Sequence, residues 1–178
     1  MARLTRDRFV EEGLRALEED GPAGLAADRI ARRLGVSRGS FYWHFANAVD
    51  FEAAVLAAWE DRWTSRIIAA VEEGAGAPSE RLRALIAKTG GRDASLYTSA
   101  KRMAGQHGEL HAVMQRIDER RISFVADLLA EGGVGPDLAA LRARIIYSWA
   151  MGQMLVSGVE GVPAEVADRL LEFGFGRD

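Results

Sequence analysis

The chain has 178 residues, enough for a substantial hydrophobic core, with a formal net charge of -3 at pH 7 and no cysteine. The lack of cysteine excludes disulfide frameworks, thiol catalysis and cysteine-based zinc sites, and it agrees with a cytoplasmic protein. The mild acidity excludes a polycation that coats nucleic acid over its whole surface. The longest uncharged run, residues 145–159, is shorter than the ~20 apolar residues that span a bilayer, so no membrane association is expected.

Apolar residues at helical spacing predict three short helices in the first 45 residues. The first follows Thr5 as N-cap and ends at Gly21, and the second covers residues 26–34 with Gly35 as its C-terminal cap. A third helix begins after Ser37. Two short helices joined by a tight turn that contains glycine form a helix-turn-helix.

Helical patterns continue to the end of the chain and predict an all-α fold. A helix capped by Asn47 is expected over residues 47–73, about 40 Å at 1.5 Å per residue, which is long enough to join two modules. Further helices are expected over residues 79–88, 95–104, 109–130, 137–159 and after residue 163. No stretch shows the alternation of a half-buried strand.

The segment Ile30–Phe45, with the sequence IARRLGVSRGSFYWHF, carries the clearest functional signal. Its Ile-Ala step, Gly-Val-Ser turn, aromatic pair, histidine and closing phenylalanine resemble the DNA-binding signature of the TetR family of bacterial transcriptional regulators. The resemblance implies a helix-turn-helix DNA-binding domain over residues 1–46. It also implies a ligand-binding and dimerisation domain over residues 47–178, joined to the first by the helix over 47–73.

The second helix of such a motif lies in the major groove and presents its N-terminal residues to base edges. Arg38 suits a forked contact with guanine O6 and N7, and the resemblance implies that Tyr42 and His44 bind phosphate oxygens. The predicted DNA-binding residues are Ser37, Arg38, Gly39, Ser40, Tyr42, Trp43 and His44. The alternative is that these rings cap a core at a helix end, but the preceding turn and the register favour DNA.

Three alanines depart from the family pattern. Ala26 and Ala27 stand where the family often has a threonine that caps the helix and touches phosphate, and Ala48 stands where it usually has a phosphate-binding lysine. Asp28 adds a negative charge nearby, and the first 50 residues are almost balanced in charge. We therefore expect few phosphate contacts and a shallow salt dependence of DNA binding.

The resemblance further implies a ligand cavity and a dimer interface in the second half of the chain. Aromatic and methionine side chains suit such a cavity, although most of them are expected to fill the core. The predicted pocket residues are Trp63, Tyr97, His107, Met114 and Met151. The last two helices resemble the family's dimer interface, with predicted contacts at Trp149, Gly152, Leu155, Val159, Leu170 and Phe173.

The remaining motifs do not support an enzyme. His107 and His111 are four residues apart, a spacing that suits a metal site, but Glu109 does not occupy the zinc-protease position. A surface or pocket-lining pair is the favoured interpretation. Neither glycine-rich segment has the form of a phosphate-binding loop, and we expect no cofactor, no metal and no catalysis.

The sequence thus predicts a homodimeric repressor that binds a palindromic operator with half-sites ~34 Å apart. Its expected partners are double-stranded operator DNA, a small-molecule effector that releases the DNA, and a second copy of the chain. Activation of transcription would use the same DNA-binding domain, residues 1–46, and stays an alternative to repression. A second alternative, motivated by Ala26, Ala27 and Ala48, is a small-molecule-binding helical protein or enzyme with a weakened DNA head.

Overall fold

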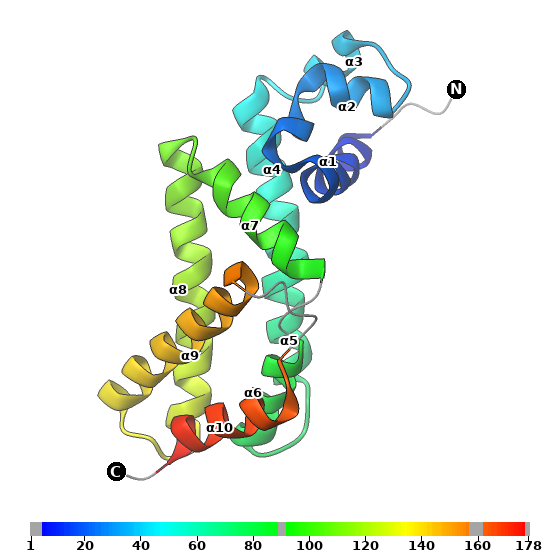
Figure 1. Cartoon of the computed structure of the whole chain (residues 1–178). Helices are drawn as coiled ribbons and strands as arrows, with labels where there is room; N and C mark the ends of the chain where they lie inside the picture. The colour runs from blue at the N-terminus through cyan, green and yellow to red at the C-terminus, as the bar shows by residue number, and fades with distance from the viewer. Residues whose placement is uncertain (1–4, 89–91, 157–161, 177–178) are drawn as a thin grey trace. The chain divides into compact units, whose positions relative to one another are not determined.

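The computed structural model describes residues 5–88, 92–156 and 162–176, with the backbone alone for residues 92–95 and 154–156. Helices make up all regular structure in these ranges, which confirms the predicted all-α fold. In chain order the helices (Figure 1) are α1 Arg6–Asp20, α2 Ala27–Arg33, α3 Arg38–Tyr42, α4 Ala48–Glu60, α5 Arg66–Glu72, α6 Pro78–Ala87, α7 Arg92–Ala104, α8 Gly108–Glu131, α9 Pro136–Val156 and α10 Ala164–Phe175. A 3-10 turn, η1 Gly21–Leu25, precedes α2, and a π-helical turn, η2 Asp61–Ser65, follows α4.

The chain forms two compact units. Unit 1 comprises Met1–Arg62 and Ser95–Met114, and unit 2 comprises Trp63–Ala94 and Gln115–Asp178. The predicted boundary at residue 46 divides a DNA-binding domain from a ligand-binding and dimerisation domain. The two compact units are defined by packing and do not test this division by function, so the boundary stays a prediction. Within the described ranges, none of the helices combines the length and the apolarity that crossing a membrane requires.

Four phenylalanines form the centre of unit 1. Phe9, Phe41 and Phe51 are completely buried, and Phe45 is almost so. The ring centroids of Phe41 and Phe45 lie 5.0 and 4.8 Å from that of Phe51, and both lie 6.1 Å from that of Phe9. These four pairs meet edge to face, which the ring quadrupoles favour. Because the rings come from α1, α4 and the segment that contains α3, they attach the helix-turn-helix to the start of α4.

Gly13 allows α1 to approach α4 closely. A β-carbon at this position would lie 2.5 Å from Cγ2 of Val55 and 2.7 Å from Cζ of Phe51. Both neighbouring side chains are completely buried, so they have little room to move aside. The small residue is therefore a packing requirement of this helix pair.

The predicted cap of the recognition helix is confirmed. The hydroxyl of Ser37 accepts a hydrogen bond from the backbone N–H of Ser40 at 3.3 Å. Gly35 has a φ of +68°, a left-handed conformation that ends α2 and begins the tight turn. Thr5 precedes α1 as predicted, but its side chain makes no capping hydrogen bond.

The predicted helix over residues 47–73 differs from the structure at its centre. Asn47 caps it as expected, since its Oδ1 accepts from the N–H of Asp50 at 2.9 Å. The α-helical geometry gives way to a π turn over Asp61–Ser65 before α5 begins. Arg121 of α8 donates to the carbonyl oxygen of Trp63 at 3.1 Å and to Oγ1 of Thr64 at 2.9 Å. Helical spacing in the sequence predicts an uninterrupted α-helix here, because it gives no information on a contact with a residue as distant as Arg121.

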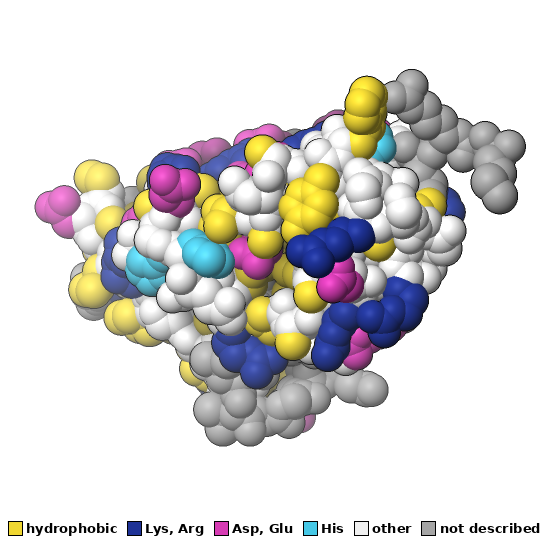
Figure 2. All heavy atoms as spheres, turned by 90° about the horizontal axis from the view of Figure 1, so that it is seen from above, with side chains coloured by type: hydrophobic (Ala, Val, Ile, Leu, Met, Phe, Trp, Pro, Cys, Tyr) yellow, Lys and Arg dark blue, Asp and Glu magenta, His cyan; other side chains and the backbone are white. Residues whose placement is uncertain are grey.

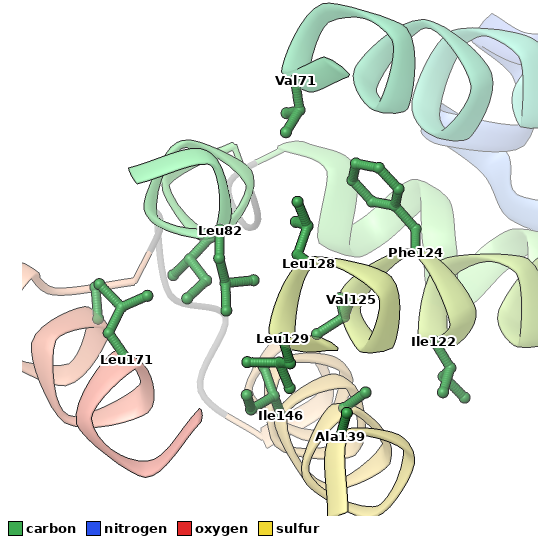
Figure 3. Packing of buried hydrophobic residues seen from close by; sticks show 13 residues of the cluster. Val71, Leu82, Ile122, Phe124, Val125, Leu128, Leu129, Ala139, Ile146 and Leu171 are labelled. Carbon is green, nitrogen blue, oxygen red and sulfur yellow. The ribbon is translucent and has the colours of Figure 1, made fainter. Parts of the chain in front are cut away.

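One apolar cluster forms the core of unit 2, and Figure 3 shows its side chains converging from α6, α8, α9 and α10. Leu82 and Leu128 are completely buried, and Ile146 and Leu171 are nearly so. Arg142 is only 7% exposed, and its Nη1 donates to the backbone carbonyl oxygens of Gly174 and Gly176 at 3.2 and 2.7 Å. The buried guanidinium therefore satisfies carbonyl groups at the end of α10.

Candidate nucleic-acid interface

The helix-turn-helix is built from α2, the turn over residues 34–37 and α3. Ile30 and Ala31 of α2 are buried, and the N–H of Val36 donates to the carbonyl oxygen of Ala31 at 2.9 Å. Phe41 is the buried residue of α3. These contacts fix one face of α3 against the protein and leave its other face in solvent.

The residues predicted to bind DNA lie on α3 and directly beside its two ends. Trp43 is 71% exposed and Tyr42 is 45% exposed, whereas large aromatic side chains are usually well buried. Ser40 is half-buried, with its hydroxyl 3.1 Å from that of Ser37. His44 is also half-buried, and its ring centroid lies 5.1 Å from that of Phe9. The other predicted residues are exposed, namely Ser37, Arg38 and Gly39.

Two neighbours hold the Arg38 side chain. Its Nε lies 3.2 Å from Oδ1 of Asp28, and its Nη2 donates to the hydroxyl of Tyr42 at 3.3 Å. The hydrogen bond to Tyr42 and the charge of Asp28 raise the pKa of Arg38, so the guanidinium remains a cation. Sequence reasoning noted the charge of Asp28 but missed this pairing, because only the folded turn brings the two residues together.

Carboxylates of α1 engage Arg33, the last residue of α2. Its Nε lies 2.5 Å from Oε1 of Glu12, its Nη2 lies 2.6 Å from Oε2 of Glu19, and its Nη1 lies 3.3 Å from Oδ2 of Asp20. Hydrogen bonds to Glu12 and Glu19 raise the pKa of Arg33. Glu12 is only 8% exposed, so Arg33 compensates a largely buried negative charge. We assign Arg33 to the attachment of α2 to α1.

The DNA-binding head, residues 1–46 of the chain, has little uncompensated positive charge. Residues 1–50 include eight arginines and eight acidic residues, and Nη2 of Arg6 lies 3.4 Å from Oδ1 of Asp50. Ala26 precedes α2 without a side-chain hydrogen bond to its first turn. Figure 2 shows basic and acidic side chains next to one another, and the described residues form no broad basic patch on the face in view. These features support the expectation of few phosphate contacts.

The predicted pocket residues are divided between the two units. Tyr97, His107 and Met114 belong to unit 1, and Trp63 and Met151 belong to unit 2. Tyr97 and Met114 are buried, and the other three are partly exposed. Their assignment to a common pocket stays a prediction.

Unit 2 contains a surface hollow of about 410 Å³, which includes none of the predicted pocket residues. It is lined by Glu72, Arg81, Phe124, Asp127, Leu128, Ala130 and Glu131. Nη1 of Arg81 lies 2.8 Å from Oε2 of Glu131. The lining is thus mostly polar at its rim, with Phe124 and Leu128 from the core beneath.

His107 lies beside a buried carboxylate in unit 1. Its Nε2 lies 3.2 Å from Oε2 of Glu52 on α4. Burial raises the pKa of Glu52, and the nearby His107 opposes this shift. His111 is exposed. In the part of the chain that the structure describes, no three His, Cys, Asp or Glu side chains are grouped to hold a metal ion.

Five of the six predicted dimer residues lie on α9 and α10. Trp149, Gly152 and Leu170 are half-buried, and Phe173 is 40% exposed. The side chain of Leu155 and the whole of Val159 lie outside the described residues. Leu141 and Ile145, which the predicted interface omits, are 57% and 46% exposed and precede Trp149 at four-residue steps. They extend the same apolar stripe of α9 toward its N-terminus.

Comparison with known proteins relates the helix-turn-helix of the chain to a known family. Residues 9–48 match the family described as bacterial regulatory proteins, tetR family. The chain is 33% identical to the transcriptional regulator AcuR of Cereibacter sphaeroides over 149 residues, which is 83% of its own length. The sequence of residues 9–48 is that of the TetR family.

Other relatives define the extent of the likeness. The chain aligns with 58% of the length of AcuR. It is also 38% identical to the tetracycline repressor protein class D of Escherichia coli over 47 residues, which are 26% of this chain and 22% of that protein. A crystal structure of a transcriptional regulator from Rhodococcus sp. Rha1 shares the fold, with a TM-score of 0.79 at 22% identity over 97% of this chain and 95% of that one. The TetR-family DNA-binding domain of this chain therefore contains α2, the turn and α3.

Proposed function

We propose that this chain is a sequence-specific DNA-binding transcriptional regulator whose α3 enters the major groove. The observation that carries the proposal is the exposed row of Arg38, Tyr42 and Trp43 opposite the buried Phe41. Arginine in this position suits guanine, and hydroxyl groups such as that of Tyr42 suit phosphate oxygens. An indole as exposed as that of Trp43 contributes little to the core, so contact with a partner accounts for it better than packing does.

The proposed regulator acts as a homodimer through α9 and α10. The exposed apolar groups of Leu141, Ile145 and Phe173, together with the half-buried Trp149, favour a self-complementary contact about a twofold axis. Among the described residues, no atom of a neighbouring element lies within 4 Å of where a β-carbon of Gly152 would be, so a second helix has room to approach there. Two heads related by this axis would read half-sites ~34 Å apart.

The proposed control is by a small molecule. Its proposed pocket residues are Trp63, Tyr97, His107, Met114 and Met151. An effector that binds best when the two recognition helices are wrongly spaced shifts the population away from the DNA-bound state. Repression is the proposed direction, supported by the match of the head to a protein named as a tetracycline repressor.

A second candidate function is small-molecule binding with a weakened DNA head. Two observations favour it, namely the balanced charge of residues 1–50 and the absence of a side-chain cap from Ala26. Arg33 is paired with Glu12 and Glu19, so it adds no uncompensated positive charge to the DNA-binding head. Under this alternative the protein would fold and dimerise but select no DNA sequence.

Selection of bound sequences from a random DNA pool at low and moderate salt tests the proposal. We expect the folded, ligand-free dimer to enrich a palindrome. The double variant Arg38→Ala, Tyr42→Ala should lose this enrichment and keep its fold, because both side chains are exposed. Arg83→Ala on α6 removes an exposed arginine outside the head and should bind as the wild type does. No enrichment by the wild type at low salt would favour the second candidate.

A further inference from the structure

Asp28 is a feature of the interface that DNA binding alone does not explain. Its carboxylate is 58% exposed in the first turn of α2, beside the recognition helix. A negative charge at this place repels the phosphate backbone. An ion pair as exposed as that between Asp28 and Arg38 contributes little to folding.

The geometry of Arg38 shows what Asp28 achieves. A guanidinium has five N–H donors in a fixed plane. Nε lies 3.2 Å from Oδ1 of Asp28 in an ion pair, and one N–H of Nη2 donates to the Tyr42 hydroxyl at 3.3 Å. Both N–H groups of Nη1 and one of Nη2 remain, which is the pair of nitrogens needed for a forked contact with guanine O6 and N7. The Tyr42 ring, with its centroid 5.5 Å from Cζ of Arg38, supports the same orientation.

We propose that Asp28 and Tyr42 are positioning residues that hold Arg38 by its Nε side, so that the Nη1–Nη2 fork reads one guanine in each half-site. This inference rests on the proposed function and deepens it. A side chain that is ordered before binding loses less conformational freedom when it meets its base. Asp28 therefore weakens binding to any DNA through its charge and strengthens the preference for guanine at one position.

Two substitutions at Asp28 test the ion pair with Arg38. Asp28→Asn removes the charge and keeps the size of the side chain, and Asp28→Ala removes both. Asp7→Asn is the matched control, since it removes an exposed carboxylate from the first turn of α1, in the same unit. Tyr42→Phe removes the hydroxyl and keeps the ring that faces Arg38.

The experiment uses the full chain, and it combines sequence selection with the Kd for the selected duplex and for a scrambled duplex at one salt concentration. We expect the wild type to select guanine at one position of each half-site. Arg38→Ala should remove this preference, a loss of roughly 5- to 100-fold in discrimination. Asp28→Ala should lose at least about threefold at that position alone and bind the scrambled duplex more tightly. Asp28→Asn should lose about as much of the preference as Asp28→Ala, because the contact is an ion pair. Tyr42→Phe should lose less than Asp28→Ala, and Asp7→Asn should leave the preference unchanged.

Three results would overturn the inference. The first is an unchanged guanine preference in Asp28→Ala, and the second is a preference that Asp28→Asn keeps and Asp28→Ala loses, because the ion pair would then not position Arg38. The third is a sharper guanine preference in Asp28→Ala, because Asp28 would then withhold Arg38 from the DNA. A wild type that selects no sequence is a separate outcome, since it removes the proposed function itself. Unchanged circular dichroism and melting temperature verify that each variant is folded.

Discussion

Replacing Gly13 by alanine tests the packing that holds α1 against α4. The added β-carbon would lie 2.5 Å from Cγ2 of Val55 and 2.7 Å from Cζ of Phe51, which is closer than carbon atoms approach without strong repulsion. Phe51 cannot move freely, because its ring centroid lies 4.8 Å from that of Phe45 and 5.0 Å from that of Phe41. The same rings support α3, so the perturbation also reaches the DNA-binding surface.

Two opposing effects set the magnitude. Alanine is favoured over glycine within a helix by about 0.5–1 kcal/mol. Overpacking of a buried site costs about 1–3 kcal/mol, and here the added β-carbon would clash with two completely buried side chains. We expect a net loss of about 1–2 kcal/mol in the local stability of unit 1, which corresponds to a roughly tenfold larger open population.

Amide hydrogen exchange followed by mass spectrometry measures this loss within each unit. Peptides from α1 and α4 should exchange roughly tenfold faster in Gly13→Ala, and peptides from α6 and α10 in unit 2 should be unchanged. Gly108→Ala in unit 1 is the control, because its β-carbon would meet no neighbouring atom within 4 Å. Equal exchange of α1 in Gly13→Ala and in the wild type would refute the argument from close packing.

Other charged and apolar groups give three further measurable outcomes. The slope of log Kd against log salt should be shallower than about eight per dimer, since the head has few uncompensated arginines, and a steeper slope would contradict this. Burial raises the pKa of Glu52 in the folded state. The folded state is therefore stabilised at acid pH, where Glu52 is neutral, and it loses this stabilisation as pH rises through the raised pKa. Glu52→Gln should therefore raise the melting temperature at pH 8, with a difference from the wild type that shrinks toward pH 4, and a pH-independent difference would argue against the buried carboxylate. Ile145→Glu should yield monomers in sedimentation equilibrium because it places a charge in the apolar stripe of α9, whereas an intact dimer would exclude this stripe from the interface.

Local sequence patterns predicted most of the secondary structure and the form of the head. Helical spacing depends on residues three and four apart, which stay neighbours whatever the rest of the chain does. The Ser37 and Asn47 caps depend on backbone groups two or three residues away, so both were predictable. The buried Phe41 and the exposed Arg38 and Tyr42 follow from the same short-range register.

The sequence by itself determined that the chain is helical, where the helix-turn-helix lies and which side of α3 faces solvent. Only the tertiary structure decided that Arg38 meets Asp28, that Arg33 is engaged by Glu12, and that Arg121 reaches the carbonyl oxygen of Trp63 at a π turn. The physical reason is that periodicity fixes the direction of a side chain relative to its own helix. The identity of its partner depends on which distant segment packs opposite, and that is settled only when the units fold.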